Sequence, residues 1–156
     1  MNWDAIGAIG EIIAAFAVVI SLIYLATQIR NQNREAKISS VHEITEAFRL
    51  AITSFQDAQR AEVYTRALNN YGGLSDAEKL QFISMVQGVL RVWEEAFYQY
   101  SEKRLDERVW NAWSAQYKDW LSSPGFQKVW EIRKHTYSAE FQLIVDSIEV
   151  GQYKLE

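Results

Sequence analysis

The chain has 156 residues, a formal net charge of −4, 49% hydrophobic residues and no cysteine. The length suits one compact domain, and the acidic balance excludes the electrostatic attraction on which nucleic-acid binding depends. Without cysteine there is no disulfide framework, thiolate metal cluster or cysteine nucleophile.

The N-terminal segment, residues 5–27, reads AIGAIGEIIAAFAVVISLIYLAT, with Glu11 as its only formal charge. A bilayer core of about 30 Å needs roughly 20 helical residues, because only a helix pairs its backbone amides where water is absent. We therefore expect a transmembrane helix over residues 1–29. A cleaved signal peptide fits less well, because the start has no positive charge, and so does a soluble core helix, because residues 12–26 offer only Ser21 and Tyr24 as polar residues.

Basic residues lie on one side of the expected span. Asp4 precedes it, whereas Lys and Arg follow it closely, which predicts an outside N-terminus and a cytoplasmic domain over residues 30–156. The basic residues also suit anionic lipid headgroups. The predicted membrane-interface residues are Trp3, Tyr24, Arg30, Arg34 and Lys37.

Small and polar residues recur on one face of the expected span, at spacings of three, four and seven, whereas larger Ile and Phe residues lie opposite. Such a stripe lets membrane helices bring their backbones together. We expect self-association or partner binding through this small-residue face, which comprises Gly7, Gly10, Glu11, Ala14, Ala17 and Ser21.

The presence of Glu11 in the expected span needs an explanation, because a carboxylate in lipid is costly unless it is paired, hydrated or protonated. A tilted helix would let it reach the outer headgroups. Alternatively, it lines a pore in an oligomer or contacts a partner's membrane helix.

The rest of the chain has helical periodicity throughout, which predicts an all-α fold in which the transmembrane helix continues into a cytoplasmic bundle of about five helices. Apolar residues between 38 and 55 predict a stalk helix to about residue 58. A helix over roughly residues 60–70 would end at Asn69–Gly73, which is rich in residues that tolerate positive φ. Ser75 and Glu78 then form a capping box that begins the next helix.

That next helix is expected to be central, and its apolar stripe comprises Leu80, Ile83, Val86, Leu90, Trp93, Phe97 and Tyr100. A further helix begins near Asp106, and another begins at Ser123 and Pro124, with Ser as cap and Pro in the first turn. The buried side expected for the latter comprises Phe126, Val129, Trp130 and Tyr137. The last helix is expected to carry Phe141, Ile144, Val145 and Ile148 and to end before Gly151.

The chain has six Trp and eight Tyr, mostly between residues 93 and 137. Aromatic residues at helical core spacing more often pack than bind ligands. The alternative is an aromatic pocket among Trp93, Trp110, Trp113 and Trp130.

Motifs for catalysis are missing from the sequence. His42 with Glu46, and Glu131 with His135, are each four residues apart and do not match a di-metal bundle, so we interpret them as solvated ion pairs or caps. We predict no catalytic, cofactor or metal site, which favours a protein without enzymatic activity.

Three segments within the first 35 residues are similar to a known protein family, namely MNWDAIGAIGEII, SLIYLA and QIR. They resemble an uncharacterised family of small bacterial single-pass membrane proteins that begin with a span containing Gly and Glu and continue into a helical cytoplasmic body. The resemblance implies a bacterial inner-membrane setting and supplies no activity or cofactor.

These observations predict a membrane-anchored, oligomeric scaffold or accessory subunit whose partners are the lipid bilayer and either further copies or a larger membrane complex, not nucleic acid. One alternative is an ion-conducting or gating oligomer with Glu11 in its lumen. The other is a membrane-bound ligand sensor or enzyme that uses the aromatic pocket.

Overall fold

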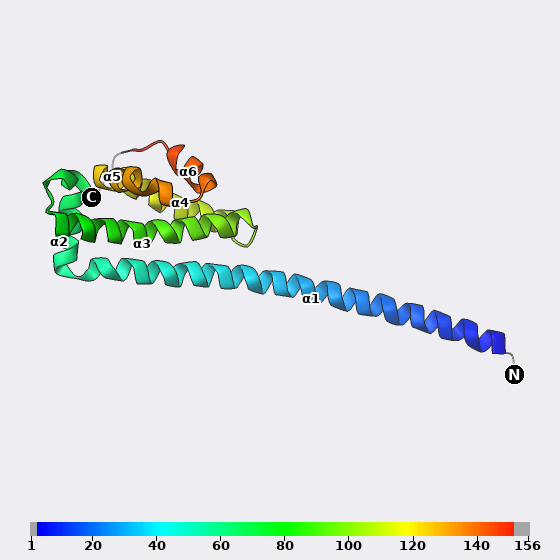
Figure 1. Ribbon diagram of the computed structural model, residues 1–156. Helices are drawn as coiled ribbons and strands as arrows, with labels where there is room; N and C mark the ends of the chain where they lie inside the picture. Colours follow the sequence, from blue (N-terminus) through cyan, green and yellow to red (C-terminus); the bar gives the residue numbers. More distant parts are fainter. Residues whose placement is uncertain (1–2, 152–156) are drawn as a thin grey trace. The chain divides into compact units, whose positions relative to one another are not determined.

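The computed structural model describes residues 3–151, and within this range all regular structure is helical, with no strand (Figure 1). The prediction of an all-α fold is confirmed. The helices are α1 (Trp3–Thr53), α2 (Ala58–Asn70), α3 (Asp76–Ser101), α4 (Glu107–Leu121), α5 (Pro124–Arg133) and α6 (Ala139–Asp146). Short 3-10 turns are η1 (Ser54–Gln56), η2 (Tyr71–Gly73) and η3 (Lys134–Thr136).

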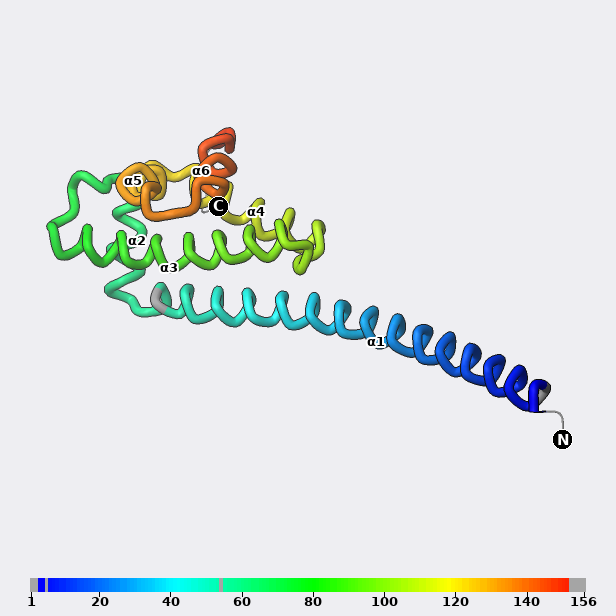
Figure 2. The backbone as a smooth tube through the Cα atoms, turned by 45° about the vertical axis from the view of Figure 1, so that its right-hand side comes forward, coloured from blue at the N-terminus to red at the C-terminus, as the bar shows by residue number. Residues whose placement is uncertain are grey.

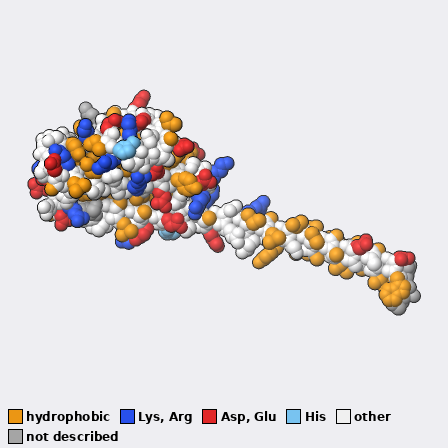
Figure 3. Space-filling model, in the orientation of Figure 1, with side chains coloured by type: hydrophobic (Ala, Val, Ile, Leu, Met, Phe, Trp, Pro, Cys, Tyr) orange, Lys and Arg blue, Asp and Glu red, His pale blue; other side chains and the backbone are white. Residues whose placement is uncertain are grey.

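The chain divides into two compact units, Met1–Ile38 and Ser39–Glu156. In the first unit, residues 3–38 are helical, and every side chain that the structure describes there is exposed. This part of α1 contains an apolar stretch long enough to cross a membrane, none of which is buried. Figure 3 shows the hydrophobic side chains along it.

The second unit, which we call the helical body, has one hydrophobic core to which α1, α2, α3, α4, α5 and α6 all contribute. Both ribbon and tube views place α5 and α6 on the same side of α3 (Figures 1 and 2). As expected, α3 supplies much of the core, including the fully buried Val86, Leu90 and Trp93.

The buried face of α3 is wider than the predicted stripe. Leu80, expected in the core, is 64% exposed, whereas Phe82 is fully buried. The reason is that α2, α4 and α5 all contact α3, so that core residues come from more than one row of side chains. The additional buried residues are Met85, Val89, Val92, Ala96 and Gln99.

The helix starts follow the predicted capping residues. Ser75 and Glu78 form the expected capping box at α3. The hydroxyl of Ser123 accepts from the backbone N–H of Phe126, with Pro124 as the first residue of α5. Asp106 caps α4 by accepting from the N–H of Arg108 at 3.0 Å. Local side chains therefore set where these helices begin.

The helix ends differ more from expectation. The helix expected to about residue 58 ends at Thr53 and is followed by η1, and the extended Asp57, which caps α2, then ends this helical stretch. Tyr137 is buried as predicted, but it follows η3 rather than belonging to α5. Ile148 follows α6, which ends at Asp146.

The turn before α3 also differs from expectation. No glycine among the described residues has positive φ, and Tyr71–Gly73 form a 3-10 turn in which Asn70 accepts from the N–H of Gly73 at 3.1 Å. Among these residues, the one non-glycine with positive φ is Lys103, at 59°, in the connection between α3 and α4.

Candidate functional site

The small-residue face lies entirely within α1, and each of its six residues is exposed. A Cβ added at Gly7 or Gly10 would have no neighbour within 4 Å. The hydroxyl of Ser21 donates to the backbone carbonyl of Ala17 at 2.8 Å, so its hydrogen bond is made within its own helix. The face is therefore open to close approach by another helix, and association through it stays a prediction.

The predicted membrane-interface residues are exposed along the same helix. Trp3 is 71% exposed and Tyr24 is 64% exposed. At a rise of about 1.5 Å per residue these two rings are separated by about 32 Å along the helix, close to the thickness of a bilayer core. Arg30, Arg34 and Lys37 follow at the polar end.

The aromatic residues of the helical body mainly pack against one another, as predicted. The ring of Trp93 stacks on that of Tyr117, with a centroid separation of 4.7 Å, and meets Phe141 edge-on at 5.3 Å. Phe48 of α1 meets Trp113 edge-on at 4.8 Å and stacks on Trp120 at 5.9 Å. Ring pairs at such separations stabilise a core beyond the area they bury.

The four Trp residues of the predicted aromatic pocket are not gathered around one cavity. The indole N–H of Trp130 donates to Asp146 Oδ1 at 2.7 Å, and Trp113 packs against Phe48. Trp93 and Trp110, by contrast, both line a cavity of about 640 Å³. The rest of its wall comes from Asn111, Ser114, Ala115, Lys118, Ile144, Ser147, Ile148 and Glu149.

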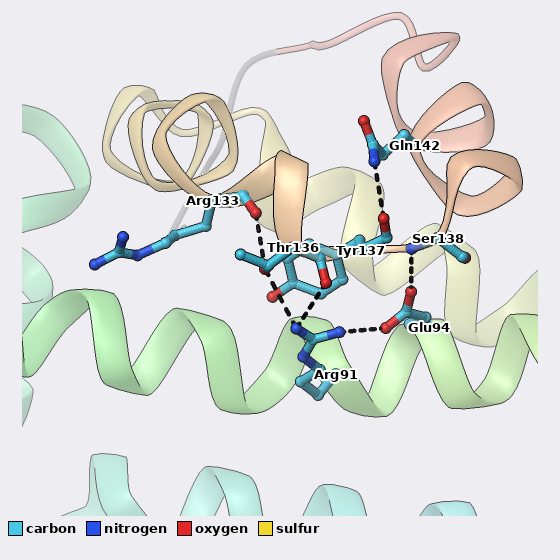
Figure 4. Close-up of polar contacts among 7 residues, drawn as sticks. All are labelled: Arg91, Glu94, Arg133, Thr136, Tyr137, Ser138 and Gln142. Atoms are coloured by element: carbon cyan, nitrogen blue, oxygen red, sulfur yellow. Dashed lines mark hydrogen bonds and ion pairs between the residues drawn. The ribbon is translucent and has the colours of Figure 1, made fainter.

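Polar groups join α3 to the end of η3 and the residues just before α6 (Figure 4). One end of the Arg91 guanidinium donates to Glu94 Oε2 at 2.6 Å, and the other donates to the carbonyl of Thr136 at 2.9 Å. The guanidinium also lies 4.1 Å from the centroid of the Tyr137 ring. Glu94 Oε1 accepts from the backbone N–H of Ser138 at 2.7 Å.

Arg91 and Glu94 also line a second cavity of about 640 Å³, but their polar atoms already bond to each other, to Thr136 and to Ser138. We interpret this network as a structural clamp. The adjacent Glu95 accepts instead from Gln99, because consecutive residues of a helix point in different directions. Sequence reasoning missed the clamp, because Thr136 is 45 residues from Arg91 in the chain.

The two histidine pairs do not assemble as sites. Glu46 bonds to Arg49 at 2.6 Å and Glu131 to Lys134 at 3.3 Å, in each case one turn along the same helical segment, while both histidines are exposed. The hydrogen bond from Arg49 lowers the pKa of the Glu46 carboxyl. Within residues 3–151, no three His, Asp or Glu side chains are grouped closely enough to hold a metal ion.

Sequence reasoning also missed Ser114, a buried polar residue on the apolar side of α4. A signal was present, because Ser114 falls four residues after Trp110 and three before Tyr117, in the middle of an aromatic stripe.

Comparison with protein-family models, curated proteins and solved structures finds no match to this chain.

Proposed function

We propose that this chain is a membrane-anchored, self-associating scaffold or accessory subunit of the bacterial inner membrane, with its helical body in the cytoplasm. The observation that supports it best is the apolar stretch of α1, whose described side chains are all exposed. Soluble proteins rarely expose a contiguous apolar patch beyond a few hundred Å². Each large apolar side chain moved from water into lipid gains roughly 1.5–3 kcal/mol, so that many such residues together favour insertion.

The proposed orientation rests on charge. Arg30, Arg34 and Lys37 follow the apolar stretch and Asp4 precedes it, so the C-terminal side should remain in the cytoplasm. Because the chain has no cysteine, single cysteines at Asp4 and Ser39 can report topology. In intact spheroplasts, a membrane-impermeant maleimide should label Asp4→Cys and leave Ser39→Cys unlabelled until lysis. The reverse pattern would overturn the orientation, and labelling of both would overturn the span.

Self-association is proposed for the small-residue face, because the backbone at Gly7 and Gly10 is uncovered and Ser21 is already bonded to its own helix. If Trp3 lies at the outer interface, Glu11 is about 12 Å deeper at roughly 1.5 Å per residue. A carboxylate at that depth is less costly against another helix than against lipid. The face and the carboxylate therefore favour the same contact.

The test compares two matched pairs of substitutions in α1. Gly10→Leu with Ala14→Leu fills the small-residue face, whereas Ile9→Leu with Ile13→Leu changes residues outside it at similar depth. Native mass spectrometry of the full chain in mild detergent should show the oligomer, or a fixed complex with other subunits, in the wild type and the Ile pair but not in the Gly10 and Ala14 pair. Unchanged assembly in both pairs, or a wild-type monomer without companions, would overturn the proposal.

The alternative, an ion-conducting oligomer, would assemble through the same small-residue face. Conductance distinguishes it from the scaffold. A carboxylate ring in a lumen selects cations, so conductance of the reconstituted protein would depend on Glu11. Cation conductance that Glu11→Gln abolishes would replace the scaffold proposal with a channel. A non-conducting wild type would leave the scaffold as the better account.

A further inference from the structure

The cavity lined by Trp93 and Trp110 has the dimensions of a small-molecule site. It lies between α3, α4 and the last residues of the described chain, and its volume of about 640 Å³ falls within the roughly 300–1,000 Å³ of typical ligand pockets. The apolar residues of its wall include Trp93, Trp110, Ile144 and Ile148, and the polar ones include Asn111, Ser114 and Ser147.

Two residues of this wall carry buried polar atoms without a hydrogen-bond partner. Trp93 is 0% exposed and Ser114 is 7% exposed, and neither Trp93 Nε1 nor Ser114 Oγ has a partner in the described part of the chain. A buried donor without an acceptor destabilises the folded chain, so a ligand that supplies an acceptor would be favoured here. By comparison, the indole N–H of Trp130 has an acceptor, Asp146 Oδ1.

The wall also indicates what kind of molecule would fit. An indole N–H is a donor only, and a serine hydroxyl can donate as well, so both can bond to a single acceptor oxygen. Lys118 and Glu149 contribute one charge of each sign, which favours a ligand without net charge.

We propose that this cavity binds an uncharged small molecule that carries a carbonyl oxygen, which accepts hydrogen bonds from Trp93 Nε1–H and the Ser114 hydroxyl. The site belongs to the helical body and does not require self-association of α1.

Access to the two polar atoms requires part of the wall to move, because neither atom is in contact with solvent. The wall residues Ser147, Ile148 and Glu149 follow the end of α6 and are not helical. The backbone N–H of Gly151 donates to Ser122 Oγ at 2.9 Å and so attaches this segment to the end of α4. A segment outside regular structure can shift at lower cost than a helix.

The test uses acetophenone as the probe and ethylbenzene as its control, which differ in the carbonyl group. The full chain is reconstituted in lipid nanodiscs with ¹⁵N-labelled tryptophan, and both probes are compared at equal free aqueous concentration. Acetophenone should shift the Trp93 indole N–H resonance downfield and leave that of Trp130 unchanged, because Trp130 already has its acceptor. Ethylbenzene should leave the hydrogen-bonding shift of Trp93 unchanged.

Substitutions then assign the polar contact. Ser114→Ala should weaken acetophenone binding about fivefold, the effect of losing one neutral hydrogen bond. Ser84→Ala, an exposed serine of α3 outside the cavity, should leave binding unchanged. The Trp130 resonance reports whether each variant is folded. No shift of Trp93, equal shifts with both probes, or unchanged binding in folded Ser114→Ala would overturn the proposal.

Discussion

Gly125, in the first turn of α5, packs directly against the backbone of Ala67 in α2. A Cβ at residue 125 would overlap the carbonyl oxygen of Ala67 and lie 2.8 Å from its carbonyl carbon and 3.0 Å from Leu68 Cα. These neighbours are backbone atoms of a helix, which cannot move aside as a flexible side chain can. Glycine is required at residue 125 because two helices meet there, and not because of its backbone conformation.

Gly125→Ala should lower the free energy of unfolding of the helical body by about 3 kcal/mol, because the extra methyl forces α5 away from α2. Gly88 of α3 offers a matched control, since a Cβ there would meet nothing within 4 Å. Gly88→Ala should raise the same free energy by about 0.5–1 kcal/mol. Urea unfolding of the full chain in mild detergent, followed by tryptophan fluorescence, measures both. Similar effects of the two substitutions would contradict the packing argument.

Arg91→Met should lower the free energy of unfolding by about 1–3 kcal/mol, because it removes the hydrogen bonds to Glu94 and Thr136 and the contact with Tyr137. Arg91→Lys should retain less than half of the stabilisation that Arg91→Met removes, because an ammonium lacks the planar geometry with which the guanidinium reaches both partners. Hydrogen exchange at the amide of Ser138 should accelerate in Arg91→Met. Arg49→Met is the control, since an exposed pair within one helix contributes under about 0.5 kcal/mol.

Glu78 should make the helical body sensitive to acid. Hydrogen bonds from the backbone and side chain of Ser75 and from Arg66 lower the pKa of its carboxyl to about 2. Because the folded state binds this proton more weakly than the unfolded state, the stabilisation is complete above the ordinary pKa of 4.5 and is lost as the pH falls toward about 2. Urea midpoints measured through this window should fall less steeply in Glu78→Gln. Parallel curves for wild type and variant would show that other groups carry the acid response.

Tyr137 should make the stability of the helical body sensitive to alkali. Burial raises the pKa of its hydroxyl from 10.0 to about 12, so the unfolded chain loses this proton first and stability falls as the pH rises through that interval. Tyr137→Phe should make the fall shallower. At neutral pH it should change stability by less than about 1 kcal/mol, because the hydroxyl has no hydrogen-bond partner among residues 3–151. A large loss at neutral pH would reveal a bond that the hydroxyl makes in solution.

Local sequence signals predicted the parts of this fold that depend on near neighbours. The capping box of Ser75 and Glu78 and the cap formed by Ser123 each involve groups three residues apart, and the structure has both. The apolar period likewise predicted the burial of Val86 and Trp93. Each of these features is decided within about one helical turn.

Features that depend on distant partners could not be predicted in the same way. The exposure of Leu80 follows from where α2, α4 and α5 contact α3, which periodicity does not encode. The ends of the clamp are 45 residues apart, and Trp130 and its acceptor Asp146 are 16 apart. Trp93 and Ser114 are 21 residues apart on different helices, so the sequence alone could not show that they line one cavity.

Phe48 bears on the order in which the chain can fold as it is synthesised. Its ring packs against Trp113 and Trp120 of α4, so the last turns of α1 belong to the core of the helical body. The ribosome makes this aromatic anchor more than sixty residues before its partners, and the core cannot close until α4 has emerged. A soluble fragment for crystallisation should accordingly begin at Ser39, because one that begins at Asp57 would leave two indole rings uncovered.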